Sequence, residues 1–360
     1  MSGTSISDRA VPGLLTKADL SGGLSFEEVR LLLALTDPED VRALLETADR
    51  VRARVVGDEV HLRGLVEFSN YCRKNCAYCG LRRDNSHVER YRLSADEIIS
   101  IAGDLDQRGI RTVVLQSGED LSYSAEALAD IIRRIKQSTS LAVTLSVGER
   151  PRVHYEMWKQ AGADRYLLRH ETVNRELFDA MECGTSFENR MRCIRDLREL
   201  DYQVGIGFMV GLPGQTLDDL AGDLMFVKEM QPDMLGIGPF IPASETPLAG
   251  RPGGSLEQTL KCVALGRILT RDTLIPATTA LATIDEFGYE LGLRAGANVV
   301  MPNWTPLDCR EQYAIYPNKR CLREDPDIWL CTLKERIAAM GRAVSAGRGH
   351  SPKKAALSAD

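Results

Sequence analysis

The feature that most restricts the fold of this chain is a regular alternation of short apolar segments with longer amphipathic ones. Helical stretches separate segments with the character of buried strands, which is typical of a parallel sheet built from strand–helix units. Eight such segments predict an α/β fold, a (β/α)8 TIM-type barrel. The eighth is weak, which leaves a shorter, partly open barrel as the alternative. The predicted strands are Leu62–Phe68, Thr112–Gln116, Ala142–Val147, Arg165–Arg169, Val204–Val210, Met234–Phe240, Ile275–Thr279 and Asn298–Met301.

Helix-start signals indicate where the barrel begins. Capping-box spacing or a Thr cap marks predicted helix starts at Ser25 with Glu28, Ser94 with Glu97, and Thr216. A further helix is predicted from about Pro38 to Val51. Because single barrels can reach about 250 residues, the 360 residues predict one barrel with an extension at each end. The predicted parts are N-terminal helices at 1–57, the barrel at 58–305, and a C-terminal extension with a solvated tail at 306–360.

Composition excludes several classes of partner. Hydrophobic residues make up 44% and charged residues 27%, which is typical of a globular protein with an apolar core. The net charge of −6 and the lack of a Lys/Arg-rich run predict no nucleic-acid or membrane partner. No signal peptide or membrane-spanning apolar run is present, so a cytoplasmic location is expected. Nine cysteines, irregularly spaced, favour ligands over a disulfide framework.

Three of these cysteines form the most informative motif. Cys72, Cys76 and Cys79 follow the first predicted strand with C-x3-C-x2-C spacing, and Tyr78 directly precedes the last. Three thiolates on one loop can hold three irons of a [4Fe–4S] cluster, leaving the fourth iron open to S-adenosylmethionine (SAM). Electron transfer into the sulfonium then releases a 5′-deoxyadenosyl radical. Zinc is the alternative, but it normally needs four ligands, and His87 lies at a spacing that fits such a site poorly.

The sequence segments around this triplet resemble those of a known enzyme family. EFSNYCRKNCAYCGLRRDN and RYRLSADEI resemble the radical SAM branch that contains biotin synthase, methylornithine synthase and the [FeFe]-hydrogenase maturase HydE. Later words, taken together, resemble the HydE family. They are LQSGED, TLSVGERP, DRYLLRHET, TSFENR, MVGLPGQT, GIGPFIPASETPLA, PATTA and GANVVMPNWTP, and the resemblance spans roughly residues 60–320.

The resemblance implies a function and its partners. HydE-like enzymes use a [4Fe–4S] cluster and SAM, and the deoxyadenosyl radical is thought to act on an iron–cysteine complex that carries CO and cyanide. That reaction serves assembly of the two-iron subcluster of the hydrogenase active site. The implied partners are this small organometallic substrate, a low-potential electron donor and other hydrogenase maturases. A methylornithine-synthase-type mutase, a biotin-synthase-like sulfur inserter and an iron-complex carrier without turnover are the alternatives.

The resemblance also implies roles for individual residues. Glu171 suits the ammonium or ribose of SAM, and Arg190 suits its carboxylate through bidentate pairing. The alternative is a buried structural Arg–Glu pair, with Arg169 as the structural partner of Glu171. The pocket around SAM would further include Tyr78, Gln116, Ser117, Thr144, Met234 and Tyr313, and Phe240 and Tyr316 would help to exclude water. Arg169, Thr278 and Thr279 would form the catalytic pocket for an anionic substrate, although paired threonines are otherwise common as barrel filling or helix caps.

The C-terminal sequence departs from part of this family. Some HydE-like proteins carry a second cluster on three cysteines spaced C-x7-C-x2-C, but after Cys321 the corresponding positions hold Trp329 and Thr332. A second cluster is therefore not expected. The remaining cysteines are interpreted as buried or incidental thiols: Cys183, Cys193, Cys262, Cys309, Cys321 and Cys331.

Overall fold

Six parallel strands form the main sheet of the protein. The structure, a computed structural model, describes residues 10–320 and 325–355. The strands pair in sequence order, each with the next along the chain. They are β2 (Gly64–Ser69), β3 (Thr112–Ser117), β4 (Ala142–Ser146), β5 (Arg165–Leu167), β6 (Gln203–Val210) and β7 (Met234–Pro239). These strands confirm the first six that the apolar segments predict.

The barrel is completed by single pairings rather than by full strands. Met234 pairs with Leu274, Pro276 with Val299, and Asn303 with Leu65, which leads from β7 round to β2. The predicted strand Ile275–Thr279 is wrong in extent, because Pro276 has no N–H to donate and Thr278 caps a helix. The Thr278 hydroxyl accepts from the Leu281 N–H at 3.4 Å, at the start of α11 (Thr279–Ile284). The eighth strand, β8 (Val299–Val300), is only two residues long.

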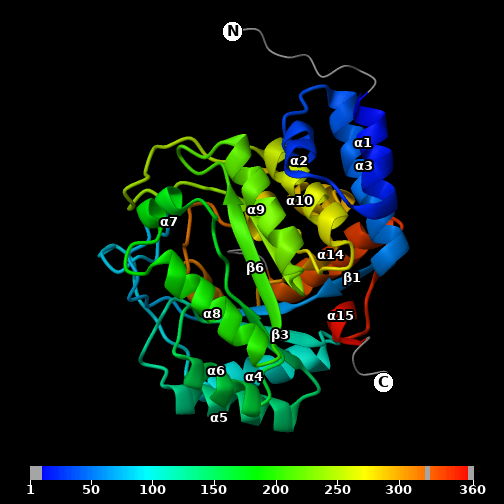
Figure 1. Cartoon of the computed structure of the whole chain (residues 1–360). Coiled ribbons are helices and arrows are strands. Elements are labelled where there is room, and N and C mark those ends of the chain that lie inside the picture. The colour runs from blue at the N-terminus through cyan, green and yellow to red at the C-terminus, as the bar shows by residue number, and fades with distance from the viewer. Residues whose placement is uncertain (1–9, 321–324, 356–360) are drawn as a thin grey trace.

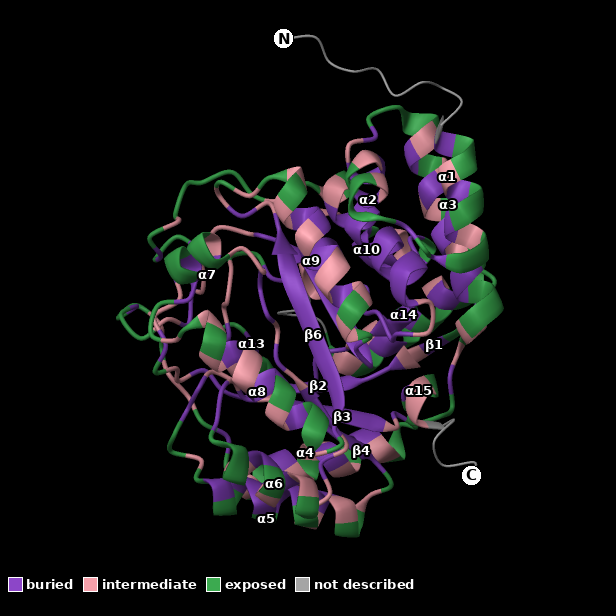
Figure 2. Ribbon diagram, in the orientation of Figure 1, coloured by how far each residue is buried: buried purple, intermediate pink, exposed green. Residues whose placement is uncertain are grey.

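Helices cover the outside of the sheet (Figure 1). They are α4 (Ala95–Gln107), α5 (Ala125–Ser138), α6 (Arg152–Gln160), α7 (Arg175–Met181), α8 (Phe187–Glu199), α9 (Leu217–Met230) and α10 (Leu256–Thr270). The predicted capping box that starts α4 at Ser94 is formed, and the predicted cap Thr216 starts α9, where it forms a capping box with Asp219. In Figure 2 the strands are buried almost throughout, whereas the helices alternate between buried and exposed faces. This is the burial expected when helices cover a parallel sheet.

Three N-terminal helices pack against the barrel on the side of α9 and α10. They are α1 (Ala10–Ser21), α2 (Phe26–Leu33) and α3 (Pro38–Val56). The predicted capping box of Ser25 and Glu28 starts α2. The helix predicted from Pro38 begins there, with Asp37 as its cap, but it continues five residues beyond Val51 to Val56.

The C-terminal part adds a small second sheet and covers one end of the barrel. β1 (Glu59–Leu62) lies between β8 and β9 (Ala343–Val344), all parallel. The expected solvated tail is only partly confirmed at residues 345–354, because exposed residues alternate with buried ones and barrel side chains bind the tail backbone. Arg165 donates to the carbonyl of Arg348 at 2.6 Å, and Gln203 accepts from the Ser351 N–H at 2.9 Å. The remaining C-terminal helices are α12 (Gly288–Arg294), α13 (Leu307–Arg310), α14 (Pro326–Ala339) and α15 (Pro352–Ala355).

Candidate active site

The carboxyl ends of the barrel strands, with the loops that follow them, enclose a cavity of about 380 Å³. The structure brings all the predicted site residues to this one cavity, although they come from segments far apart in the sequence. The lining includes Cys72, Cys76, Tyr78, Cys79, Gln116, Ser117, Thr144, Arg169, Glu171, Arg190, Met234, Thr278, Thr279 and Tyr313. Phe240 and Tyr316 line it as well.

The cysteine loop follows β2 and is held tightly from both sides. A Cβ atom on Gly118 would lie 2.2 Å from the carbonyl oxygen of Tyr71 and 2.8 Å from Cβ of Cys72, so only glycine fits there. A Cβ on Gly80 would lie 2.2 Å from the carbonyl oxygen of Ala314. The Glu119 N–H donates to Sγ of Cys72 at 3.4 Å. The loop is therefore fixed by the turn after β3 and by the C-terminal extension.

The chemistry of the three thiols fits a cluster. Cys72, Cys76 and Cys79 are free, and burial raises the pKa of all three, that of Cys79 to about 12. Thiolates at such buried positions need the charge of bound metal for stability. In the part of the chain that the structure describes, no three His, Cys, Asp or Glu side chains converge closely enough for a single metal ion. Zinc normally takes four ligands on one ion, whereas a cubane takes each of three thiolates on a different iron, so the three thiols suit a cluster better than zinc.

A buried network of charges lies beside the cysteine loop, with Glu149 at its centre. The Glu149 carboxylate accepts from Nζ of Lys74 at 2.9 Å, from Oγ1 of Thr185 at 2.6 Å, from Nδ2 of Asn189 at 2.9 Å and from Nε of Arg190 at 2.7 Å. Only 2% of this residue is exposed. Burial would raise the pKa of Glu149, but the charge of Arg190 and the hydrogen bonds outweigh it and lower the pKa to about 2.

The guanidinium of Arg190 is fully engaged within this network. Besides Glu149, it donates from Nη2 to Oε2 of Glu182 at 2.9 Å and from Nη1 to the carbonyl of Arg169. Glu171 instead pairs with Arg169, at 3.0 Å between Oε2 and Nη2. Arg190 thus pairs with Glu149 and Glu182, and the structural alternative, a pair of Arg169 with Glu171, is formed.

Glu171 itself has an unusual environment. Its φ of +65° lies in the left-handed region, where non-glycine residues are uncommon. Burial raises the pKa of its carboxyl, although the charge of Arg169 opposes this effect. Its N–H donates to the carbonyl of Gly207 at 3.0 Å, and its carbonyl accepts from the Met209 N–H at 3.2 Å. The neighbouring strand β6 therefore holds Glu171 with its side chain at the cavity.

The floor and far wall of the cavity contain charges that the sequence did not single out. Lys319 pairs with Glu67, both almost completely buried, and Nδ2 of Asn303 donates to Oε2 of Glu67 at 2.9 Å. Arg63, also buried, donates from Nη1 to Sδ of Met234 at 2.8 Å. Glu67 carried a usable signal, since a carboxylate inside an otherwise apolar strand needs a partner. No local pattern marks Lys319.

The positions after Cys321 are occupied by ordinary packing residues, while Cys321 itself lies outside the described residues. The Trp329 ring packs edge-on against Tyr289, and Oγ1 of Thr332 donates to the Ile328 carbonyl at 3.0 Å within α14. Of the other predicted incidental thiols, Cys193 and Cys262 are buried, Cys309 is half-buried, and Cys183 and Cys331 are exposed. Among the helices of residues 10–320 and 325–355, none is long and apolar enough to cross a membrane.

Comparison with known proteins decides the family. Residues 66–227 match the model of the radical SAM superfamily. The chain is 52% identical over 316 residues to the [FeFe] hydrogenase maturase subunit HydE of Thermotoga maritima, covering 88% of this chain and 90% of that protein. The chain belongs to the HydE family of radical SAM enzymes. The family predicted from the sequence words is thereby confirmed, as is the class of enzyme.

More distant relatives of this HydE-family chain agree with the fold. It is 31% identical over 279 residues to 3-methylornithine synthase of Methanosarcina acetivorans, covering 77% of this chain and 79% of that one. The crystal structure of methylornithine synthase superposes with a TM-score of 0.80 at 27% identity, covering 92% of this chain and 97% of that one. The predicted barrel-type α/β fold is confirmed. Membership of the family implies a [4Fe–4S] cluster and SAM as cofactors.

Proposed function

We propose that this enzyme cleaves SAM reductively at a [4Fe–4S] cluster on Cys72, Cys76 and Cys79. The radical then acts on an iron–cysteine complex with CO and cyanide, during assembly of the two-iron subcluster of [FeFe]-hydrogenase. One observation carries the proposal: the three thiols, the charged Arg169 side chain and the Thr278 hydroxyl all line a single cavity. A radical formed beside the thiols can therefore reach a substrate bound at Arg169 without passing through solvent.

When bound, the cluster and SAM supply an electron and a homolytic carbon–sulfur cleavage. The protein residues orient and shield these partners. Glu171, buried and held beside Arg169, is suited to accept hydrogen bonds from the SAM ammonium or ribose. Arg190 is engaged by Glu149 and Glu182, so we assign it to positioning these carboxylates beside the cysteine loop, in place of binding the SAM carboxylate.

The substrate assignment rests on charge and on the family. Arg169, paired with Glu171, offers a guanidinium to the cavity, and Arg63 adds a buried cationic side chain, whereas the charge of Lys319 is offset by Glu67. Such a cavity suits a small anionic complex that loses its water on entry. The 31% identity to 3-methylornithine synthase supports a carbon-skeleton mutase as the second candidate. A low-potential electron donor and other hydrogenase maturases are the proposed protein partners, and a cytoplasmic location remains a prediction.

The cluster assignment is tested with Cys76→Ala and a matched control, Cys183→Ala, whose thiol is exposed outside the cavity lining. After anaerobic reconstitution, the wild type and the control should hold about four irons per chain and release deoxyadenosine on reduction. Cys76→Ala should lose deoxyadenosine release. Full activity of that variant, or about eight irons with two distinct paramagnetic signals in the wild type, would contradict the assignment.

The substrate pocket is tested with Arg169→Ala and Arg169→Lys in a maturation assay supplied with a synthetic iron–cysteine–carbonyl–cyanide complex. Losing a charged hydrogen bond costs roughly 1.5–3 kcal/mol, or about ten- to a hundredfold in substrate binding. Arg169→Ala should lose this much hydrogenase activation while its iron content and circular dichroism stay normal, and Arg169→Lys should keep part of it. Undiminished activation by Arg169→Ala would refute the pocket. Efficient turnover of an amino acid in place of the iron complex would favour the mutase.

A further inference from the structure

The outer helical layer of the barrel is open between α8 and α9. Elsewhere, consecutive helices pack against each other: α4 on α5, α5 on α6, α6 on α8, and α9 on α10. In contrast, α8 and α9 do not pack closely, and Figure 1 shows β6 in the space between them. A surface groove follows this gap. The outer layer is therefore not closed between these two helices.

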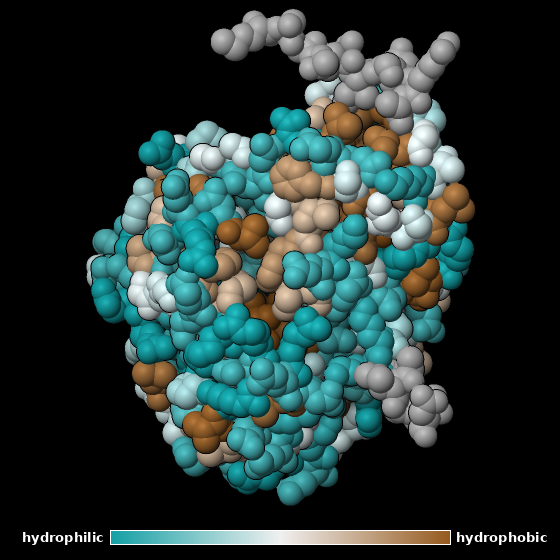
Figure 3. Space-filling view, in the orientation of Figure 1, coloured by the Kyte–Doolittle hydropathy of each residue, from teal (hydrophilic) through white to brown (hydrophobic). Residues whose placement is uncertain are grey.

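The groove is lined mainly by apolar side chains. Figure 3 shows apolar surface gathered between α8 and α9, within a face that is otherwise largely hydrophilic. The apolar lining residues are Val173, Phe187, Met191, Ile194, Met225, Phe226 and Met230. Methionine side chains are unbranched and polarizable, and they adapt to a bound apolar surface better than branched residues do. This composition is typical of grooves that receive an amphipathic helix.

One charge at the groove rim has no counterpart. Arg195 on α8 is exposed, and its side chain makes no hydrogen bond or ion pair with any residue that the structure describes. Its neighbours on the same helix are engaged: Arg192 pairs with Asp196 and Arg198 donates to the Met230 carbonyl at 3.0 Å. On the opposite rim, Lys228 and Glu229 offset each other in charge. The α8 side of the groove is thus locally positive and free to bind a carboxylate.

We propose that the groove between α8 and α9 docks an amphipathic helix of a partner protein, with an acidic residue facing Arg195. A helix is convex and fits a groove, whereas a second copy of this chain would bring the same concave surface and leave a void. At the α-helical rise, α8 and α9 are each about 20 Å long, which accommodates three to four turns of a bound helix. A bound helix would bury the apolar lining and close the outer layer.

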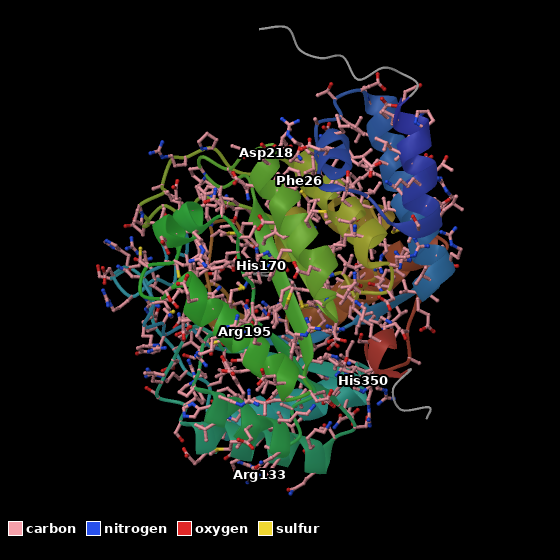
Figure 4. The ribbon with its side chains drawn as sticks, in the orientation of Figure 1. Phe26, Arg133, His170, Arg195, Asp218 and His350 are labelled. Atoms are coloured by element: carbon pink, nitrogen blue, oxygen red, sulfur yellow. The ribbon has the colours of Figure 1, made fainter. Side chains whose placement is uncertain are left out.

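The floor of the groove is in contact with the cavity segment. The Phe226 ring lies 4.9 Å from the ring of His170, which is completely buried between the cavity residues Arg169 and Glu171. From the same helix, Oδ1 of Asp223 accepts from the Val173 N–H at 2.6 Å. Figure 4 labels His170 beneath the groove and Arg195 on α8. Docking would therefore bear on residues 169–174, and through them on the substrate side of the cavity.

The probe is a synthetic helical peptide of about 15 residues with leucines along one face and a glutamate beside them. Two further peptides replace the glutamate by lysine or scramble the leucine positions. Fluorescence anisotropy with the anaerobic holoenzyme should show the acidic peptide binding about fivefold more tightly than the lysine peptide, and no binding of the scrambled peptide. Arg195→Glu should weaken that binding about fivefold and favour the lysine peptide, since exposed charge pairs contribute up to about 1 kcal/mol. Arg133→Glu on the distant α5 is the matched control and should change neither.

Three results would overturn the proposal. The first is equal binding of the scrambled peptide, and the second is unchanged discrimination in Arg195→Glu. The third is a dimer in light scattering that Met225→Asp dissociates, because a second copy would then occupy the groove. Hydrogen exchange tests the contact with the cavity: the acidic peptide should slow amide exchange in residues 169–174, and unchanged exchange there would refute that connection.

Discussion

Glu149→Gln is the substitution that tests the buried network most directly. The change keeps the size of the side chain but removes the negative charge that Lys74 and Arg190 share. Both cations are nearly inaccessible to water, at 8% and 7% side-chain exposure, so neither can be solvated when the carboxylate is lost. Removing one member of a buried ion pair is strongly destabilising for this reason.

The size of the effect follows from the pKa. The pKa of Glu149 falls from its ordinary value of 4.5 to about 2, because Arg190 and the hydrogen bonds outweigh burial. At 1.36 kcal/mol per unit, the folded protein stabilises the charged carboxylate by about 3 kcal/mol relative to the unfolded chain. Since the folded-state pKa is lowered, this contribution is complete above about pH 4.5 and is lost as the pH falls towards about 2. Glu149→Gln should therefore cost about 3 kcal/mol at pH 7.

Urea unfolding followed by circular dichroism, under anaerobic conditions at pH 7, measures this loss. Glu188→Gln is the matched control, because Glu188 also pairs with an arginine but is 61% exposed. It should cost far less than Glu149→Gln, because solvent screens an exposed ion pair. For the cluster-free chains, the stability difference between wild type and Glu149→Gln should shrink as the pH falls from 4.5 towards 2. A loss at pH 7 no greater than that of the control would refute the role of Glu149 as the centre of the network.

Two further predictions concern the cysteine loop and pH. Gly118→Ala should lower the iron content after reconstitution, because its Cβ would meet backbone at 2.2 Å and displace the cysteine loop; Gly103→Ala in α4, with nothing within 4 Å of its Cβ, should leave the iron content unchanged. Burial lowers the pKa of His61 to about 4. Because the unfolded chain then binds the proton more readily, stability should fall as the pH drops from about 6.5 to 4, by at most about 3 kcal/mol. His61→Asn should flatten the unfolding free energy over this window, and parallel pH curves for the two proteins would contradict the assignment.

The strands could be predicted where burial itself leaves a pattern. Strands covered on both faces are apolar runs, and this is why β2 to β7 coincide with predicted segments. The predicted seventh strand is reduced to isolated pairings of Leu274 and Pro276, because Pro276 has no N–H to donate and Thr278 already caps α11. β1 and β9 were not predicted, since they pair across more than 280 residues and β9 is only two residues long. Pairing between such distant short segments leaves no local signal.

The position of the candidate site could be predicted from the sequence, but most of the ion pairs within it could not. In parallel barrels, the loops after the strands gather at one end, so residues from segments far apart in the sequence could be expected to share a cavity. The ionic partners depend on side-chain reach in three dimensions, which spacing does not encode. Arg190 accordingly pairs with Glu149 and Glu182, and Glu171 with Arg169. Glu149 lies within the segment TLSVGERP, yet nothing in the sequence indicated the four side chains that donate hydrogen bonds to it.

The network around Glu149 also connects several of the sequence segments that carry the family resemblance. Lys74 comes from the cysteine loop, Glu149 from the loop after β4, and Thr185, Asn189 and Arg190 from the start of α8. Backbone hydrogen bonds also join the cysteine loop to residues 181–183, from the Asn75 N–H to the Cys183 carbonyl at 3.3 Å and from the Ala77 N–H to the Met181 carbonyl at 2.8 Å. Because each buried charge needs its partner, losing one residue leaves another unpaired, and the cost is several kcal/mol. The cysteine loop is therefore held by backbone hydrogen bonds together with a buried set of charges, in which each member depends on the others.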